Sequence, residues 1–144
     1  MDNKFDVIVI GAGPSGMMAA GTAAKNSMNV LIIERNNRVG KKLMITGKGR
    51  CNITNNCDID TVINSVPCNG KFLYSALSRF SPKDTMEFFE SLGLELKTER
   101  GNRVFPSSDR AIDVVNAMEK FIKQSGCNIL NDRVSSLIIE DNKI

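Results

Sequence analysis

The sequence predicts an α/β fold of the doubly wound, Rossmann-like type: a parallel sheet with helices, plus a small β-meander. Two observations carry this prediction. A β-branched apolar run at 4–10 leads into the glycine-rich sequence GAGPSG and then into an alanine-rich segment that favours a helix. A second apolar run at 30–33 ends at Glu34, which completes a strand–helix–strand unit over 4–34. Because both runs are almost continuously apolar, we expect strands that are buried on both faces of the sheet.

The bulk composition fits one ordinary domain over residues 1–144. Hydrophobic residues make up 42% and charged residues 24%, close to the averages of soluble proteins. The chain shows neither a basic leader before an apolar segment nor an apolar run of membrane-spanning length, so we expect a cytoplasmic protein without a membrane partner. The four cysteines are then expected to be reduced, and the lack of histidine argues against a metal site and excludes a histidine base.

The middle of the chain is expected to form a loop and then a helical and hairpin excursion. Glycines and asparagines predict a long loop over 35–56. The excursion, over 70–106, would contain a short helix at 72–80 and a second helix that is capped by Ser81 and ends at Gly93. Two short strands around the sequence ERGN would complete it as a hairpin.

Residues 108–144 are expected to begin with the clearest amphipathic helix of the chain, at 111–123. Strands at 127–130 and 134–140 and a turn at the sequence EDNK would follow. Because Ile144 comes directly after that turn, where a partner strand should begin, we expect a domain that is incomplete at its C-terminus. Residues 1–144 would then be the N-terminal part of a longer protein, and inactive alone.

The first functional motif is G-x-G-x-x-G, formed by Gly11, Gly13 and Gly16 between a predicted strand and a predicted helix. In a dinucleotide site the first glycine permits the turn, the second lets the backbone approach a pyrophosphate, and the third lets the helix pack on the strand. The helix N-terminus offers N–H groups and a positive dipole to phosphates. Pro14 presets the first helical turn, and the Ser15 hydroxyl can bond a phosphate oxygen. A glycine-rich turn that binds nothing is the alternative.

Glu34 lies 23 residues after Gly11, at the end of the second predicted strand. A carboxylate at this place accepts hydrogen bonds from the hydroxyls of the adenosine ribose, and its charge disfavours a 2′-phosphate. The alternative is a solvated glutamate at a strand end.

Six cations and no carboxylate lie between Arg35 and Cys57, although the whole chain carries a net charge of only +3. Such local positive charge indicates an anionic ligand at one site. A P-loop is excluded because six residues separate Gly40 from Gly47 and neither Ser nor Thr follows Lys48. The run also lacks aromatic side chains, so we expect no nucleic-acid partner.

Three segments closely resemble the BaiN/YhiN-type family of NAD(P)/FAD-dependent oxidoreductases: VIVIGAGPSGMMAA, ERNNRVGKKLMITGKGRCNITN and RVFPSSDRAIDVVNAM, in this order. The resemblance covers essentially the whole chain, and the block from GKK to NITN is highly specific. This sequence has Lys48 where the family usually has a third glycine. Members of the family are much longer, with an inserted β-rich domain and a later glycine-rich segment that contacts FAD.

The resemblance implies an FAD-binding domain and hydride transfer from NAD(P)H through the flavin to a small organic substrate such as an activated alkene. The loop at 35–56 would bind the flavin end of FAD. The implied hydrogen-bonding residues are Thr46, Gly47, Gly49 and Asn52, and the implied cations near the phosphates or the ring are Lys42 and Arg50. We add Arg35, which adjoins the ribose carboxylate. Val134 would contact adenine through its backbone, with an ordinary core valine as the alternative.

Cys51 adjoins Arg50, which could lower the pKa of the thiol. No second cysteine lies at C-x-x-C spacing, so we expect a packing or flavin-adjacent role in preference to a catalytic disulfide. Two other functions stay open. An NAD-dependent dehydrogenase would place a helix soon after Glu34 and a third parallel strand near 55–60, and a non-catalytic flavin- or nucleotide-binding protein would need neither. The residues name no catalytic acid or base, no substrate, no preference between NADH and NADPH, and no oligomeric state.

Overall fold

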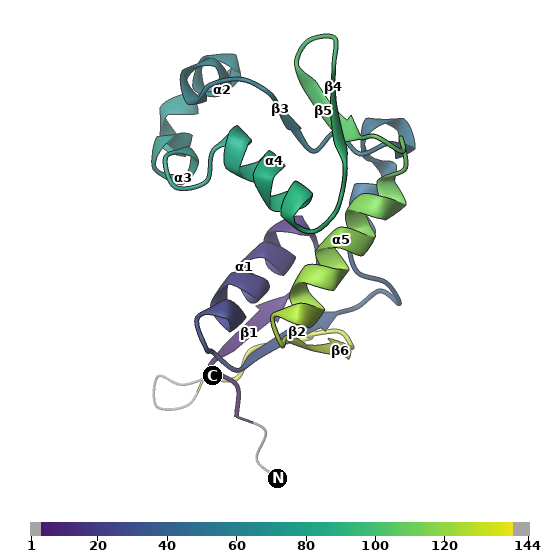
Figure 1. The fold of residues 1–144 in the computed structure, drawn as a ribbon. Coiled ribbons are helices and arrows are strands. Elements are labelled where there is room, and N and C mark those ends of the chain that lie inside the picture. The colour runs from purple at the N-terminus through teal and green to yellow at the C-terminus, as the bar shows by residue number, and fades with distance from the viewer. Residues whose placement is uncertain (1–3, 140–144) are drawn as a thin grey trace. The chain divides into compact units, whose positions relative to one another are not determined.

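A computed structural model describes residues 4–139 (Figure 1). The chain divides into two compact units, one made of residues 1–42 and 118–144 and the other of residues 43–117. Among the described residues, no helix is long and apolar enough to cross a lipid bilayer.

The first unit is built on a parallel sheet of three strands. These are β1 (Val7–Ile10), β2 (Val30–Glu34) and β6 (Asn128–Asn131), in the order β1-β2-β6. Helix α1 (Pro14–Lys25) connects β1 to β2 and packs against both strands. This arrangement confirms the predicted Rossmann-like α/β fold and its strand–helix–strand unit.

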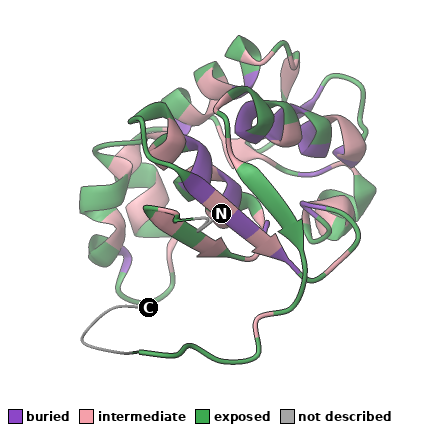
Figure 2. Ribbon diagram, turned by 90° about the horizontal axis from the view of Figure 1, so that it is seen from below, coloured by how far each residue is buried: buried purple, intermediate pink, exposed green. Residues whose placement is uncertain are grey.

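Burial differs between the strands of this sheet and along them (Figure 2). Val30 and Ile32 are fully buried, whereas Ile8 and Ile10 on β1 are 50% and 57% exposed. Successive side chains of a strand point to opposite faces, and β1 alternates between half-buried and exposed residues. The prediction that both faces of the first strand are buried is therefore wrong for the described residues. An apolar run predicts a strand but does not specify how many layers cover it.

Helix α5 (Ala111–Gln124) confirms the predicted amphipathic helix. The apolar residues at three- and four-residue steps are all buried: Ala111, Val114, Val115, Met118, Phe121 and Ile122. Within the first unit, α1 and α5 meet where Gly21 faces the ring of Phe121. A Cβ atom at Gly21 would overlap that ring. The absence of a side chain at Gly21 is what permits the close approach.

The second unit carries a small antiparallel sheet of order β3-β5-β4. Its elements are η1 (Leu43–Gly49), β3 (Thr54–Asn55), α2 (Ile59–Ser65), η2 (Gly70–Leu73), α3 (Tyr74–Leu77), α4 (Pro82–Ser91), β4 (Leu96–Glu99) and β5 (Arg103–Pro106). The β4–β5 hairpin and the Ser81 cap were predicted, and Ser81 and Asp84 form a complete capping box. Helix α2 was not predicted. Asp58 caps it by accepting from the Thr61 N–H at 2.6 Å.

Three other predicted segments need correction. The predicted loop at 35–56 contains the short elements η1 and β3, and the predicted helix at 72–80 is the pair η2 and α3. β3 pairs antiparallel with β5, which is not the parallel strand near 55–60 that a simple dehydrogenase would show. The strand predicted from Val134 is wrong: residues 134–139 form no strand. Apolar side chains alone do not make a strand, because its backbone must also pair with a neighbour. The predicted turn at EDNK lies outside the described residues.

Candidate dinucleotide-binding site

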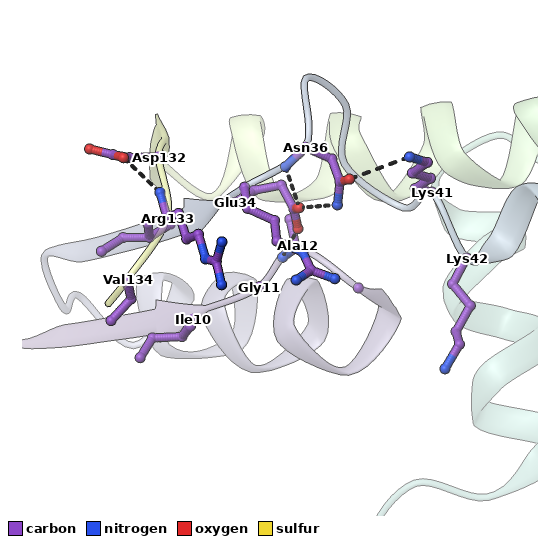
Figure 3. A pocket seen from close by; sticks show the side chains of 13 residues that line it. Ile10, Gly11, Ala12, Glu34, Asn36, Lys41, Lys42, Asp132, Arg133 and Val134 are labelled. Atoms are coloured by element: carbon purple, nitrogen blue, oxygen red, sulfur yellow. Dashed lines mark hydrogen bonds between the residues drawn. The ribbon is translucent and has the colours of Figure 1, made fainter. Parts of the chain in front are cut away.

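A pocket of about 470 Å³ lies in the first unit (Figure 3). It is lined by residues 10–13, 33–36, 41–42 and 132–134. Three of these groups lie at the carboxyl ends of the parallel strands, which end at Ile10, Glu34 and Asn131. This edge is where open α/β sheets bind ligands, and the volume suits a small-molecule site.

The glycine loop takes the shape that its spacing predicts. Gly11 has φ of +98°, a left-handed conformation that favours glycine, and its N–H donates to the Ile33 carbonyl at 2.8 Å. A Cβ atom at Gly16 would overlap the Gly11 carbonyl oxygen. Gly16 therefore lets α1 begin directly against the loop.

Gly13 differs from both of these glycines, because neither its backbone conformation nor the described residues around it require the absence of a side chain. Its φ of −75° and ψ of 176° are open to any residue. Apart from its two neighbours in the chain, no described residue has an atom within 4 Å of the place where its Cβ would be. A pyrophosphate that approaches the backbone at this position would account for the missing side chain. The open space beside the backbone of Gly13 is thus the feature of this chain that best fits a bound dinucleotide.

The N-terminus of α1 adjoins the glycine loop. Pro14 occupies the start of the helix, and no side chain caps it at Gly13. The Met17 N–H makes the first helical bond, to the Gly13 carbonyl at 2.9 Å. The N–H groups of Ser15 and Gly16 precede that bond, so they belong to the first-turn groups that helices offer to anions.

Glu34 is buried, with only 8% exposure, and holds the glycine loop. Its Oε2 accepts from the Ala12 N–H at 2.7 Å. Its Oε1 accepts from the Asn36 backbone N–H at 2.8 Å and from the Asn36 Nδ2 at 2.6 Å. Burial acts to raise the pKa of this carboxyl group, but the hydrogen bonds from Asn36 and Ala12 outweigh it, so the pKa is lowered. Glu34 is therefore ionised at neutral pH and fixed in place.

The turn after β2 is held from β6. The Asn131 Nδ2 donates to the carbonyl oxygens of both Glu34 and Asn36, and the Asp132 N–H donates to the Glu34 carbonyl at 3.1 Å. Lys41 donates to the Asn36 Oδ1 at 3.4 Å. Neither Asn36 nor Asn131 was among the predicted site residues, because their importance depends on contacts that no local motif marks.

Several cations reach the same pocket. Of the predicted contacts, Arg35, Lys42 and Val134 line it together with Gly11, Gly13 and Glu34, and the structure adds Lys41 and Arg133. Positive charge of this kind suits an anionic ligand, and the carboxylate of Glu34 is chemically able to accept a hydrogen bond from a hydroxyl group.

The remaining predicted contacts, residues 46–52, lie in the second unit and form a tightly wound loop. Four residues of this loop have positive φ: Gly47 (55°), Lys48 (58°), Gly49 (84°) and Cys51 (62°). Lys48 therefore has the conformation that glycine adopts most easily, which matches the glycine expected there from the resemblance. Thr46 closes the loop, because its carbonyl accepts from the Cys51 N–H at 3.1 Å.

Arg50 is engaged by carboxylates of the same unit. Its guanidinium contacts both Glu99 oxygens, at 2.9 and 3.2 Å, and an Asp109 oxygen at 3.1 Å. It also lies 4.1 Å from the centre of the Phe105 ring, and Lys97 contacts the same two carboxylates. The hydrogen bond from Arg50 lowers the pKa of Glu99. Two cations face two anions in this cluster, so the positive charge of Arg50 is locally balanced.

Cys51 and Asn52 are also held within the loop. Burial raises the pKa of the Cys51 thiol, and a hydrogen bond with Thr46 offsets only part of this effect. The expectation that Arg50 lowers that pKa is wrong, because the guanidinium is directed to Glu99. The Asn52 amide, turned so that its nitrogen faces the carbonyls of Val104 and Thr54, donates to them at 3.1 and 3.0 Å. Among the described residues, no group of three or more Cys, Asp or Glu side chains is placed to hold a metal ion.

A parallel sheet, a glycine turn at a helix N-terminus and an acidic residue after the second strand together define a dinucleotide-binding domain of the Rossmann type. The chain belongs to the family described as HI0933-like protein Rossmann domain, whose profile matches residues 5–144. This confirms the resemblance to the BaiN/YhiN-type flavoproteins. The family binds FAD, so the predicted cofactor is also confirmed.

Individual relatives are similar to this chain in sequence and are much longer than it is. A 3-dehydro-bile acid delta(4,6)-reductase from Clostridium scindens is 37% identical over 84% of this chain and 29% of its own length. A ribosomal RNA dihydrouridine synthase from Escherichia coli is 30% identical over 80% of this chain and 28% of its own. The chain thus spans less than a third of either relative.

A solved structure supports the fold. The 3-ketosteroid-delta4-(5alpha)-dehydrogenase from Rhodococcus jostii RHA1 matches with a TM-score of 0.71 over 97% of this chain and 40% of that chain. At 14% sequence identity, this likeness concerns the fold alone.

Proposed function

We propose that this chain is the FAD-binding part of a reductase that takes hydride from a reduced nicotinamide and delivers it, through the flavin, to a carbon–carbon double bond. FAD supplies the hydride chemistry when bound. The chain would bind the adenosine ribose at Glu34 and the pyrophosphate at Gly13 and the N-terminus of α1. Residues 46–52 would contact the flavin end. The open position at Gly13, with no structural reason to be glycine, is the observation that carries the proposal.

Chemistry that two relatives share supports a proposal for the substrate class. The name of one relative states reduction of a bile acid at positions 4 and 6. The other makes dihydrouridine, which differs from uridine by reduction of a ring double bond. In uridine, and in a 3-oxo steroid with a 4,5-double bond, the reduced bond is conjugated to a carbonyl. We therefore propose an α,β-unsaturated carbonyl compound as substrate, and we propose that activity requires more chain than these 144 residues.

The first test identifies the cofactor and the hydride donor. The purified full-length protein, not these 144 residues alone, should be yellow and should release FAD on heating, as detected by mass spectrometry. Under anaerobic conditions NADH or NADPH should bleach the flavin absorbance. Release of NAD without FAD would indicate a plain dehydrogenase. FAD that neither nicotinamide can reduce would indicate a non-catalytic flavin-binding protein.

The second test separates substrate classes. Anaerobically reduced enzyme should be reoxidised by an α,β-unsaturated ketone and not by the corresponding saturated ketone. Uridine-containing RNA serves as the competing substrate, because one relative acts on ribosomal RNA whereas the sequence of this chain predicts no nucleic-acid partner. Faster reoxidation by RNA than by the ketone would reverse that prediction.

The cytoplasmic location of the protein stays a prediction.

A further inference from the structure

The carboxylate of Glu34 is already largely occupied by the protein (Figure 3). Oε1 accepts two hydrogen bonds, from the backbone N–H and the Nδ2 of Asn36, at 2.8 and 2.6 Å. Oε2 accepts one, from the Ala12 N–H at 2.7 Å. Ala12, Glu34 and Asn36 all line the pocket, so these contacts lie where a ligand would bind.

The orientation of the Asn36 amide is determined from both ends. Its Nδ2 faces a carboxylate oxygen, which only accepts, and its Oδ1 faces the Lys41 ammonium, which only donates, at 3.4 Å. The opposite orientation would place an oxygen against the carboxylate. The backbone of this turn is held separately by Asn131, so the path of the chain does not depend on the Asn36 side chain.

A carboxylate offers about four lone-pair positions, two on each oxygen. The two positions on Oε1 are used by Asn36 and one on Oε2 is used by Ala12, which leaves a single acceptor position on Oε2. An adenosine ribose presents two neighbouring hydroxyl groups. Recognition of both by Glu34 would need one acceptor position on each oxygen.

We propose that Asn36 is a specificity-determining positioning residue that restricts Glu34 to one ribose hydroxyl, accepted through Oε2. The inference deepens the proposed function, because it requires that the pocket hold the adenosine end of a dinucleotide. The second hydroxyl then makes no hydrogen bond with Glu34. The site therefore discriminates strongly against loss of one hydroxyl and only weakly against loss of the other.

The test uses the purified full-length protein, freed of bound flavin, and calorimetry with three nucleotides. ADP shares its adenosine and diphosphate with FAD, and 2′-deoxy-ADP and 3′-deoxy-ADP each lack one hydroxyl. Loss of the recognised hydroxyl should weaken binding about tenfold or more, because a hydrogen bond to a charged group is lost, and loss of the other should change binding by less than about twofold. This measurement needs no variant and so does not depend on whether one folds.

The variant Asn36→Ala should change the pattern of discrimination in a defined way. With Nδ2 removed, one position on Oε1 becomes free, and the second hydroxyl should now also contribute, several-fold in affinity. A merely structural role of Asn36 would weaken all three nucleotides alike and leave their ratios unchanged. Asn37→Ala is the matched control, because Asn37 is the next residue, is exposed and does not line the pocket. Asn37→Ala should show the same ratios between the affinities for the three nucleotides as the unmodified protein.

Two results would overturn this inference alone. One is an equal loss of affinity for both deoxynucleotides in the unmodified protein, and the other is an Asn36→Ala variant that keeps the original ratios. If the unmodified protein binds neither ADP nor FAD, the proposed function fails and the inference fails with it. The two failures are distinguishable, because ADP binding is measured before any comparison of ratios.

Discussion

The guanidinium of Arg50 and the carboxylate of Glu99 face each other through two hydrogen bonds, Nη1 to Oε1 at 2.9 Å and Nη2 to Oε2 at 3.2 Å. The pair joins the loop at 46–52 to the end of β4, although the two residues are 49 positions apart in the chain. Such two-point contacts fix orientation as well as distance. Arg50 therefore acts first on the shape of the loop that is proposed to contact the flavin.

We predict that Arg50→Ala lowers the thermal stability of the protein modestly, because both partners remain about a third exposed and are screened by solvent. The effect should shrink at high salt. A double-mutant cycle with Glu99→Ala, followed by thermal unfolding, measures the coupling directly. Arg79→Ala, at an exposed arginine outside this cluster, is the control for loss of a charge. Additive effects of Arg50→Ala and Glu99→Ala would show that the pair contributes nothing.

We predict that Lys48→Gly stabilises the protein. Lys48 has φ of +58°, and a residue with a side chain pays roughly 1 kcal/mol or more for that conformation. Glycine removes this strain but adds freedom to the unfolded chain, so we expect a net gain of up to about 1 kcal/mol in the free energy of unfolding. Gly49→Ala is the opposite control: its φ is +84°, and its Cβ would meet no atom of the described residues within 4 Å apart from its chain neighbours. It should destabilise through the backbone alone. A Lys48→Gly protein that unfolds more easily would contradict the strain argument.

Elements whose cause is local were predictable from the sequence. The order of strand, GAGPSG, helix and Glu34 requires only neighbouring residues, and α1 and β2 follow it closely. The Ser81 cap and the apolar face of α5 likewise depend on residues that are only three or four positions apart in the sequence. Val134 shows the limit of this reasoning, because its segment has the composition of a strand but lacks a pairing partner within the described residues.

The parts of the site that could not be predicted depend on long-range pairing. Asn131 reaches Glu34 across 97 positions, and it does so only because β6 pairs with β2. Arg50 is one of six cations in a stretch of sequence without carboxylates, which suggests that its positive charge is not paired. The β4–β5 hairpin and the turn before α5 nevertheless bring Glu99 and Asp109 to it. The residue types in the sequence show which positions are charged. Which opposite charges they meet depends on the fold.

We predict that Gly13→Ala lowers FAD affinity about tenfold or more, the scale of one lost charge-assisted hydrogen bond, without reducing stability. The backbone at Gly13 suits alanine, and its Cβ would enter open space. That space is where the pyrophosphate is proposed to lie. Fluorescence titration of FAD measures the affinity, and thermal unfolding without FAD measures the stability.

Gly16→Ala is the informative contrast for Gly13→Ala. Its Cβ would overlap the Gly11 carbonyl oxygen, so it should reduce both stability and FAD affinity. Overpacking of this kind typically costs about 1–3 kcal/mol. If Gly13→Ala bound FAD as the unmodified protein does, the pyrophosphate could not approach the backbone there, and the proposed position of the dinucleotide would be wrong.

We predict that the ionised carboxylate of Glu34 stabilises the folded protein and that this stabilisation is lost in acid. Hydrogen bonds from Asn36 and Ala12 lower its pKa in the folded state, against the effect of burial, so the unfolded chain binds its proton first as the pH falls. The stabilisation is complete above the ordinary glutamate pKa of about 4.3 and is lost as the pH falls through the lowered value. Glu34→Gln should therefore be less stable at pH 7 and should lose less stability between pH 5 and pH 3. Glu90→Gln, on the exposed face of α4, controls for the charge. Urea unfolding at each pH gives the difference, and parallel curves for Glu34→Gln and the unmodified protein would show that the carboxylate of Glu34 is not held as described.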